Sequence, residues 1–444
     1  MQKARSFALI ALAILACAPS SVRAYGAEFD LGNYSDVGIY VVEASTNRVL
    51  VANNEDRIYE PASLTKLLSI LTAMDFLPLD AKITYTEEIK ASVRPNSSLA
   101  RLVVGENLSF MQIIYAMLLP SGNDAARALG VACAREACSE PDLSVNASLE
   151  LFASLMNAKA EEIGLESSHF TNPDGFPGEG TYSTAKDMAK LGLMAMACQP
   201  IAETASLRYA YISTNLANHI WVNTNNLIQP NLDIYNDPQR GGDNIYFSDI
   251  ATGLKTGNAG DIGGRGLLFT ASDGAMSVCG ALLHVTKDMQ ESIWSASSSI
   301  IVFAYDAYAV TSFGDGDNSY ISIPVANRAL MEKQEIRLHA KTQITACLPS
   351  EKAGSATAEI VAASDAFEIT PNGSLALKKD IEPGEVVLLA IYCIDGDEIG
   401  IVEYFSSTPY LKASYKDASL IATVAILFIA ASTNVLRRKK SAQY

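Results

Sequence analysis

The sequence predicts an α+β domain followed by a small all-β domain. Short β-type runs stand at both ends of a long block of helical sequence, which indicates a sheet packed against helices. After residues 314–317 (Gly-Asp-Gly-Asp) the pattern changes to short strands divided by turns. The chain has 444 residues, 49% of them apolar, which allows two or three domains and excludes a disordered chain.

The strands of the first domain come from both ends of its sequence. Residues 38–42 and 49–52 are β-type runs joined by the polar segment 45–48, which predicts a hairpin. Runs of the same type return at 266–270 and 276–285. We therefore expect one antiparallel sheet that is closed by the first and the last strands.

The helical block begins with residues 62–76. Its apolar residues recur at helical spacing, and Pro61 and Ser63 are typical of a helix start. Four further helices are predicted in this block, at residues 109–118, 124–134, 149–163 and 183–196.

The second domain is predicted at residues 319–410, as a small β-sandwich. Residues 386–394 and 399–405 are β-type runs separated by Asp395-Gly396-Asp397, and Asp-Gly between two such runs is a strong hairpin signal. A short linker, residues 411–417, follows this domain.

The amino-terminal residues 1–24 are predicted to be a signal peptide. Lys3 and Arg5 precede the apolar run 7–18, which is too short for a typical membrane span, and Val22-Arg23-Ala24 is a suitable cleavage site. The alternative is an uncleaved amino-terminal anchor. With cleavage near residue 25, the first domain spans residues 25–318.

The other end of the chain predicts a transmembrane helix at residues 418–436. This stretch has no charged residue and is long enough to cross most of a bilayer core. Four consecutive basic residues, 437–440, follow it, so the positive-inside rule places the tail 437–444 in the cytoplasm. We therefore expect a cell-membrane protein with a single carboxy-terminal span and an extracytoplasmic body.

Charge and composition exclude several kinds of partner. The chain has 33 basic and 49 acidic residues, a net charge of −16, so it is not expected to bind nucleic acid. Its four histidines are scattered, without a His-Glu-x-x-His or Cys-x-x-Cys motif, so we expect no metal or other cofactor. Cys133 and Cys138 are near enough to bridge if the chain between them turns, but spacing does not decide disulfide connectivity.

The first motif with chemical potential is Ser63-Leu64-Thr65-Lys66. Residues i and i+3 of a helix share a face, so the amine of Lys66 can approach the hydroxyl of Ser63. A serine hydroxyl needs a neighbouring base to become a good nucleophile, and a lysine held neutral by burial or cationic neighbours can provide one.

Two further motifs follow along the chain. Ser121-Gly122-Asn123 offers a hydroxyl and an amide on a predicted loop between helices. Lys255-Thr256-Gly257, near the start of a predicted β region, offers a cation, a hydroxyl and a glycine that lets a substrate backbone approach. Each motif alone is weak evidence for a function. The order of the three motifs, however, is typical of penicillin-binding proteins and class A β-lactamases, which have Ser-Asp-Asn as the middle element.

The chain resembles the low-molecular-mass penicillin-binding proteins of the D-alanyl-D-alanine carboxypeptidase family, serine peptidase family S11. Seven segments support the resemblance in family order: 60–66, 121–126, 156–160, 170–175, 182–188, 223–227 and 253–257. Three departures are Gly122 in place of Asp, Asp174 where the family often has His, and Asn258-Ala259-Gly260 after the third motif.

The resemblance implies a β-lactamase/transpeptidase-like catalytic domain that acts on peptidoglycan stem peptides ending in D-Ala-D-Ala, with β-lactams as covalent inhibitors. Ser63 would be the nucleophile, Lys66 the general base and Ser121 a proton relay, while Lys255 keeps the site cationic. The implied catalytic residues are Ser63, Lys66, Ser121, Asn123 and Lys255, and the implied substrate-binding residues are Lys255, Thr256, Gly257 and Asn258.

Three alternatives remain at this point. The same residues could serve a D,D-endopeptidase that cuts wall cross-links. A β-lactamase is less favoured, because the sequence between the second and third motifs has no Glu-x-x-x-Asn element of the class A kind. A non-catalytic wall-binding protein is disfavoured because all the motif residues are present.

Overall fold

The computed structural model describes residues 29–178, 180–232, 242–286, 292–314, 320–325, 335–371 and 374–412. The chain divides into two compact units, Met1–Ala309 and Val310–Tyr444, so the division lies earlier than the boundary expected after residue 318. The predicted signal peptide, transmembrane helix, basic tail and most of the linker lie outside the described residues. Within the described ranges, no helix is long and apolar enough to cross a membrane.

The first unit is built on a five-stranded antiparallel sheet with the order β2-β1-β11-β10-β9. Its strands are β1 (Gly38–Glu43), β2 (Val49–Asn53), β9 (Ala251–Asn258), β10 (Arg265–Ser272) and β11 (Ser277–Val285). Pairing of β1 with β11 confirms that the first and last strands of this domain close one sheet. Strand β9 is an edge strand.

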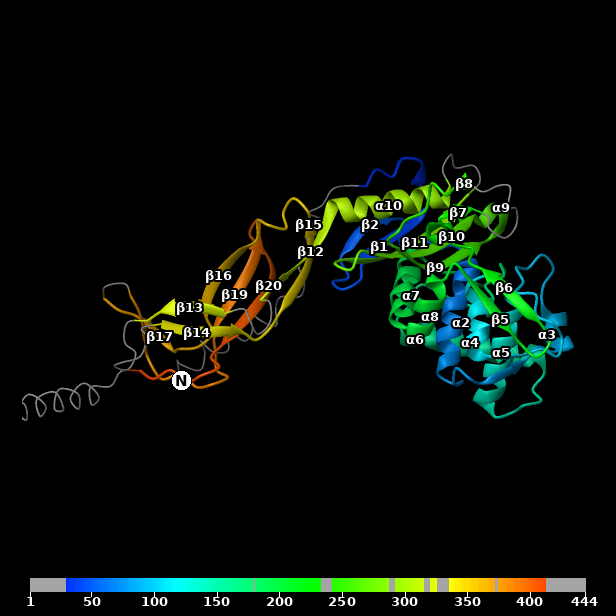
Figure 1. The fold of residues 1–444 in the computed structure, drawn as a ribbon, viewed down its shortest axis with the longest axis horizontal. Helices are drawn as coiled ribbons and strands as arrows, with labels where there is room; N and C mark the ends of the chain where they lie inside the picture. The colour runs from blue at the N-terminus through cyan, green and yellow to red at the C-terminus, as the bar shows by residue number, and fades with distance from the viewer. Residues whose placement is uncertain are drawn as a thin grey trace, which may run out of the picture. The chain divides into compact units, whose positions relative to one another are not determined.

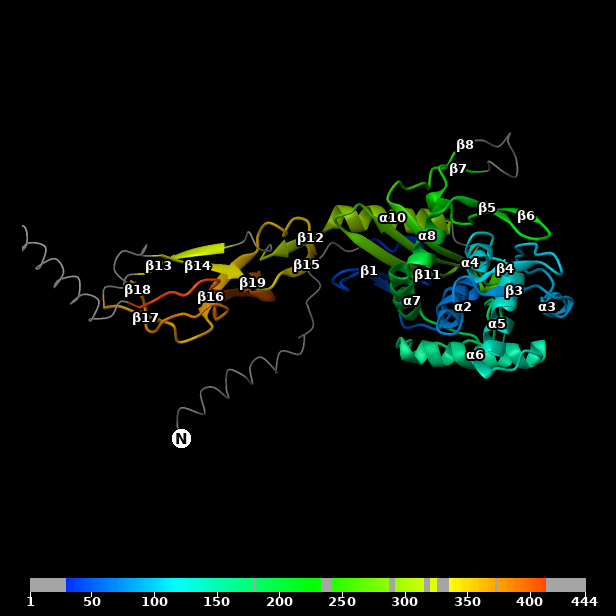
Figure 2. The same cartoon turned by 60° about the horizontal axis from the view of Figure 1, so that its bottom comes forward.

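Helices cover both faces of this sheet (Figures 1 and 2). Helix α7 packs on β1, β10 and β11, and helix α10, which the sequence analysis did not predict, packs on β10 and β11 from the other side. The main helices are α2 (Thr65–Met74), α4 (Phe110–Leu118), α5 (Asn123–Cys138), α6 (Val145–Glu162), α7 (Ala185–Ala197), α8 (Gln199–Ser206) and α10 (Ile293–Ala307).

Shorter elements connect these parts. They are the helices η1 (Gly32–Tyr34), η2 (Ala62–Leu64), α3 (Glu87–Ser92), η3 (Asn226–Ile228) and α9 (Gly260–Gly263), and the strand pairs β3 (Lys82–Thr84) with β4 (Asn107–Ser109), β5 (Tyr209–Ser213) with β6 (Asn218–Val222), and β7 (Asn231–Leu232) with β8 (Gly242–Asp243). Helix α5 continues through Cys133 to Cys138, so the turn required for a bridge between these two cysteines is not formed.

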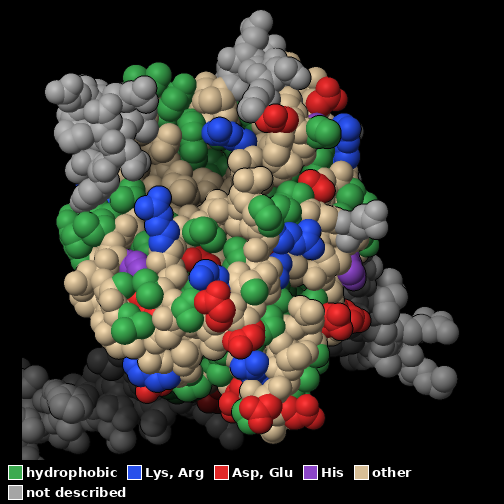
Figure 3. Space-filling view, turned by 90° about the vertical axis from the view of Figure 1, so that its right-hand side faces the viewer, with side chains coloured by type: hydrophobic (Ala, Val, Ile, Leu, Met, Phe, Trp, Pro, Cys, Tyr) green, Lys and Arg blue, Asp and Glu red, His purple; other side chains and the backbone are tan. Residues whose placement is uncertain are grey.

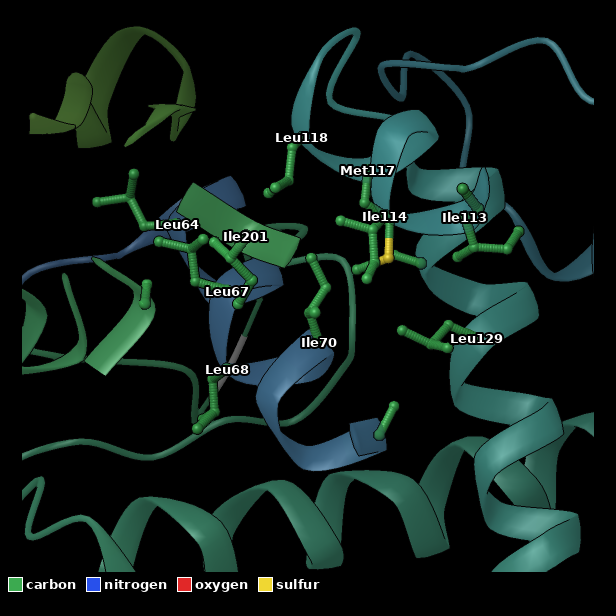
Figure 4. Close-up of a cluster of buried hydrophobic side chains, with 14 of the residues drawn as sticks. Leu64, Leu67, Leu68, Ile70, Ile113, Ile114, Met117, Leu118, Leu129 and Ile201 are labelled. Atoms are coloured by element: carbon green, nitrogen blue, oxygen red, sulfur yellow. The ribbon is translucent and has the colours of Figure 1, made fainter. Parts of the chain in front are cut away.

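Helix α2 lies at the centre of the helical layer. It contacts α4, α5, α6 and α7, so almost its whole surface is buried. Figure 4 shows its apolar side chains meeting those of α4, α5 and α8; the labelled residues are Leu64, Leu67, Leu68, Ile70, Ile113, Ile114, Met117, Leu118, Leu129 and Ile201. Each large apolar side chain buried in this way contributes about 1.5–3 kcal/mol. This packing fixes α2 and the residues at its start.

The regular elements described in the second unit are strands, the first of which begins two residues before the division. They are β12 (Tyr308–Phe313), β13 (Tyr320–Pro324), β14 (Glu335–Ala340), β15 (Ile344–Pro349), β16 (Thr357–Ala362), β17 (Phe367–Ile369), β18 (Leu375–Leu377), β19 (Val386–Ile394) and β20 (Asp397–Phe405). Five of them form a sheet with the order β13-β14-β20-β19-β16. Asp395 and Gly396, both with positive φ, connect β19 to β20, which confirms the predicted hairpin.

Candidate active site

Ser63 and Lys66 meet at the start of α2. Ser63 lies in η2, a 3₁₀ turn that leads directly into α2, and Lys66 lies in the first turn of the α-helix. The predicted single helix over both residues is therefore a 3₁₀ turn followed by an α-helix. The two side chains nevertheless meet as predicted, because Lys66 Nζ lies 2.8 Å from Ser63 Oγ.

Lys66 is completely buried, and all its hydrogen bonds are made within the protein. Besides Ser63, its Nζ donates to Asn123 Oδ1 at 2.8 Å and to the main-chain oxygen of Asp174 at 2.7 Å. Burial lowers the pKa of Lys66 to about 8, against the opposing effect of the Asp174 and Asp124 carboxylates, while the charge of Arg127 adds to the lowering. About a tenth of the amine is therefore neutral at pH 7, far more than for an ordinary lysine.

Lys255 brings a second buried amine into the same site from β9. Its Nζ donates to Ser121 Oγ at 2.9 Å and to the main-chain oxygen of Thr256 at 3.0 Å. Burial and the nearby charge of Lys66 lower the pKa of Lys255 well below its ordinary value. Desolvation therefore opposes the charged form of Lys255 in the free site, and the cationic role expected for this residue stays a prediction.

The middle motif is held in a tight loop before α5. Ser121 has a φ of 62° and its hydroxyl accepts a hydrogen bond from Lys255, while Asn123 begins α5. A Cβ on Gly122 would lie 2.7 Å from Ala100 Cβ and 2.8 Å from the Ala116 oxygen. The glycine that replaces the more usual Asp is thus required by close packing at this position.

The third motif lies in the second half of β9. Thr256 Oγ1 is 2.6 Å from Thr224 Oγ1, so two hydroxyls lie side by side next to the Lys255 amine. Thr224 belongs to the segment 223–227, which the sequence analysis quoted without giving any residue in it a role. Only the tertiary contact assigns Thr224 to the site.

Gly257 and Asn258 complete β9. A Cβ on Gly257 would lie 3.1 Å from the Pro61 oxygen and 3.3 Å from Leu64 Cγ. The glycine therefore lets the turn around Ser63 approach the strand, whereas the sequence analysis expected it to make room for substrate. Asn258 is exposed, and its Oδ1 accepts a hydrogen bond from the main-chain N–H of Gly260.

Asp174 is a component of the site that the sequence analysis noted only as a departure from the family. Its carboxylate accepts hydrogen bonds from Arg127 Nε at 2.7 Å and from the main-chain N–H of Phe176 at 2.9 Å. The next residue, Gly175, has a φ of 69°, and a Cβ on it would lie 1.8 Å from the Ala62 oxygen. The segment 173–175 is therefore pressed against the turn that holds Ser63.

The described residues around the site contain no dedicated metal centre, and the face shown in Figure 3 carries no one-sided charge. Over the described part of the chain, no group of three or more His, Cys, Asp or Glu side chains is arranged to hold a metal ion. Figure 3 shows basic and acidic side chains intermixed on the face of the first unit that it presents.

The chain matches the family model described as D-alanyl-D-alanine carboxypeptidase, peptidase S11, over residues 35–286. It is 29% identical over 234 residues to D-alanyl-D-alanine carboxypeptidase DacF of Bacillus subtilis, covering 52% of this chain and 57% of that protein. It is 28% identical over 261 residues to a D-alanyl-D-alanine carboxypeptidase of Streptomyces sp. strain K15, covering 56% and 81% respectively.

Solved structures of a DD-transpeptidase and a penicillin-binding protein have a similar fold. The crystal structure of the Streptomyces K15 DD-transpeptidase matches with a TM-score of 0.51 and 26% identity, covering 60% of this chain and 96% of that one. Penicillin-binding protein 5 from Haemophilus influenzae shares the fold with a TM-score of 0.57 at 19% identity, covering 84% and 97%. The chain belongs to the S11 family of D-alanyl-D-alanine carboxypeptidases.

Proposed function

We propose that this protein is a serine-type D-Ala-D-Ala carboxypeptidase that removes the terminal D-alanine from peptidoglycan stem peptides through an acyl-enzyme on Ser63, and that penicillins acylate the same residue. The observation that carries the proposal is the 2.8 Å contact between Lys66 Nζ and Ser63 Oγ. A hydroxyl and a buried amine at this distance form an activated nucleophile without a histidine.

The first step is attack of Ser63 Oγ on the carbonyl of the penultimate D-alanine. Neutral Lys66 takes the hydroxyl proton, and the new Oγ–C bond gives a tetrahedral oxyanion. The main-chain N–H groups of Ser63 and Asn258 stabilise that oxyanion, and each such donor is worth about 3–4 kcal/mol. Asn123 hydrogen-bonds the stem peptide.

Substrate binding favours the charged form of Lys255, which burial opposes in the free site. The terminal carboxylate binds at Lys255 and Thr256, and an anion at this position favours the charged form of Lys255. A charged Lys255 in turn favours the neutral form of Lys66, which is the form that acts as base.

The second half of the reaction releases D-alanine and regenerates the enzyme. Ser121, which accepts a hydrogen bond from Lys255, relays the proton that Lys66 took to the departing amine as the C–N bond breaks. Water then attacks the acyl carbon, the bond from that carbon to Ser63 Oγ breaks, and the water proton passes through Lys66 to Oγ, which frees the shortened stem peptide and restores the hydroxyl. The chain's own side chains provide every proton transfer in this scheme.

The test of the nucleophile is Ser63→Ala. This variant should lose both D-alanine release and covalent labelling by a fluorescent penicillin, while Ser154→Ala, on the exposed face of α6, keeps both. Labelling of the Ser63→Ala protein would show that the nucleophile is a different residue.

Two assays separate the related activities. D-alanine release from a pentapeptide, measured beside cleavage of a cross-linked dimer, distinguishes a carboxypeptidase from an endopeptidase. A long-lived acyl-enzyme on benzylpenicillin is expected, and rapid turnover of that acyl-enzyme would indicate a β-lactamase.

We also propose that the catalytic unit works outside the cell and is attached to the membrane by residues 418–436, with the tail 437–444 in the cytoplasm. The support is the sequence pattern of an apolar stretch followed by four basic residues. The full-length protein should sediment with membranes, and a chain ending at residue 412 should not. Sedimentation of both proteins with membranes would contradict this attachment.

A further inference from the structure

We propose that the ion pair between Arg127 and Asp174 is the positioning element for the Lys66 base: it fixes the Asp174 carbonyl that holds the amine, and it places one buried cation and one buried anion near that amine. This inference rests on the proposed function, because the pair acts on the reaction only through Lys66.

Asp174 contacts both the cation of the ion pair and the Lys66 base, the first with its side chain and the second with its main-chain oxygen. One carboxylate oxygen accepts from Arg127 Nε at 2.7 Å, the other accepts from the Phe176 N–H at 2.9 Å, and the main-chain oxygen accepts from Lys66 Nζ at 2.7 Å. Holding the carboxylate at both oxygens leaves its peptide carbonyl little freedom to turn away from the amine.

The residues on either side of Asp174 are held against the active-site helix. The Pro173 oxygen accepts from Ser69 Oγ of α2 at 2.7 Å, and Gly175 lies directly against the Ala62 oxygen. The carbonyl that faces Lys66 is therefore the middle one of a segment that is anchored at three consecutive residues.

Helix α5 provides two residues, Asn123 and Arg127, that support the position of the Lys66 amine. Asn123 and Arg127 are four residues apart, so they lie on the same face of the helix. Asn123 accepts from Lys66 directly, and Arg127 reaches it through Asp174. A shift of α5 would therefore move both supports of the base together.

The pair is buried, so its charges act on Lys66 at low dielectric. The side chains of Arg127 and Asp174 are 7% and 0% exposed. The charged groups that bear on Lys66 are Asp174 and Asp124, which raise its pKa, and Arg127, which lowers it, with Lys255 facing it from β9. Removal of one member of the pair therefore shifts the Lys66 pKa in a direction set by the charge that remains.

The experiment is the rate of acylation by a fluorescent penicillin, measured in a single turnover as a function of pH. Asp174→Asn leaves the cation of Arg127 alone, so the midpoint of the profile should fall by about one pH unit. Arg127→Gln leaves the anion, so the midpoint should rise. The double variant Arg127→Gln/Asp174→Asn removes both charges and should return to near the wild-type midpoint.

Loosening of the Asp174 carbonyl should also reduce the plateau rate of the single variants, by about tenfold. Arg127→Lys, which keeps the charge, should keep the wild-type midpoint. Lys186→Gln is the matched control, because it removes the exposed ion pair between Lys186 and Asp56, and it should leave the profile unchanged.

Thermal unfolding establishes which variants are folded. If Asp174→Asn does not fold, Arg127→Gln and the double variant still give different expectations, a raised midpoint and a midpoint near that of the wild type, and decide the question. Slower acylation with an unchanged midpoint in the folded variants would overturn the inference and leave the pair a purely structural role. Failure of the proposed function is recognised separately, since the wild-type protein would then take up no penicillin or Ser63→Ala would still take it up.

Discussion

Lys255 Nζ donates a 2.9 Å hydrogen bond to Ser121 Oγ, although the two residues are 134 positions apart in the chain. The contact forms a second amine–hydroxyl pair beside that of Lys66 and Ser63. Both amines are buried, and burial together with the charge of Lys66 lowers the pKa of Lys255. The site therefore contains two amines close enough for the charge of one to affect the proton affinity of the other.

Replacement of the base should nearly abolish chemistry without removing the nucleophile. Lys66→Met keeps an unbranched side chain at the buried position and removes the amine, so penicillin acylation of Ser63 should slow by about 10²- to 10⁴-fold. Lys159→Met, which removes an amine paired with Asp75 and Glu162, should keep the wild-type rate. Rapid acylation of Lys66→Met would show that another group accepts the Ser63 proton.

The rate of penicillin acylation should rise with pH. Lys66 acts as base in its neutral form, and burial lowers its pKa to about 8, so the rate should increase through this region and level off above it. One unit below the midpoint, about a tenth of the maximal rate should remain. Stopped-flow or quenched labelling from about pH 6 to 10 provides the profile. A rate that falls over this range would require a protonated catalyst and would contradict the assignment of Lys66.

The two threonine hydroxyls should both contribute to binding of the substrate carboxylate. Thr256→Val and Thr224→Val should each reduce kcat/KM for D-alanine release by about 10- to 100-fold, since a hydrogen bond to a charged group is worth about 1.5–3 kcal/mol. Because the hydroxyls contact each other at 2.6 Å, the double variant should lose less than the product of the two effects.

A substrate with an amidated carboxy-terminus is the control for this prediction. The wild-type protein should hydrolyse the amide poorly, and Thr256→Val should add little to that loss. An equal effect of Thr256→Val on the free acid and on the amide would place the carboxylate elsewhere.

Gly175 should not tolerate a side chain. In Gly175→Ala the added Cβ would meet the Ala62 oxygen at 1.8 Å, so the turn holding Ser63 must move, and both acylation and thermal stability should fall strongly. Gly274→Ala is a matched control, because Gly274 also has a positive φ, 89°, but has open space around it. Its cost should be about 1–2 kcal/mol with full activity. Equal losses of activity in the two variants would exclude a specific effect on the active-site turn.

Local sequence patterns were sufficient to predict the features that depend on residues close together in the chain. The spacing of Ser63 and Lys66 places their side chains on one face, because three residues make nearly one helical turn. The Asp395-Gly396 pair specifies its hairpin because both residues adopt positive φ. Alternation and helical periodicity likewise located β1, β2 and α4 close to their observed bounds.

Other features depend on residues that are distant in the chain. Helix α10 was missed, and neither the contact of Thr224 with Thr256 nor that of Arg127 with Asp174 has a local signal. Gly122 and Gly257 are required by the close approach of segments that only the folded chain brings together.

The order of the motifs alone predicted a nucleophile and its neighbouring amine, and the structure places the two side chains within hydrogen-bond distance. The tertiary structure decided how readily the two amines take up a proton, because the pKa values of Lys66 and Lys255 depend on burial and on charges contributed by other elements. Burial is a property of the packed domain, in which α2 is enclosed by its neighbouring helices and β9 lies against the turn before it.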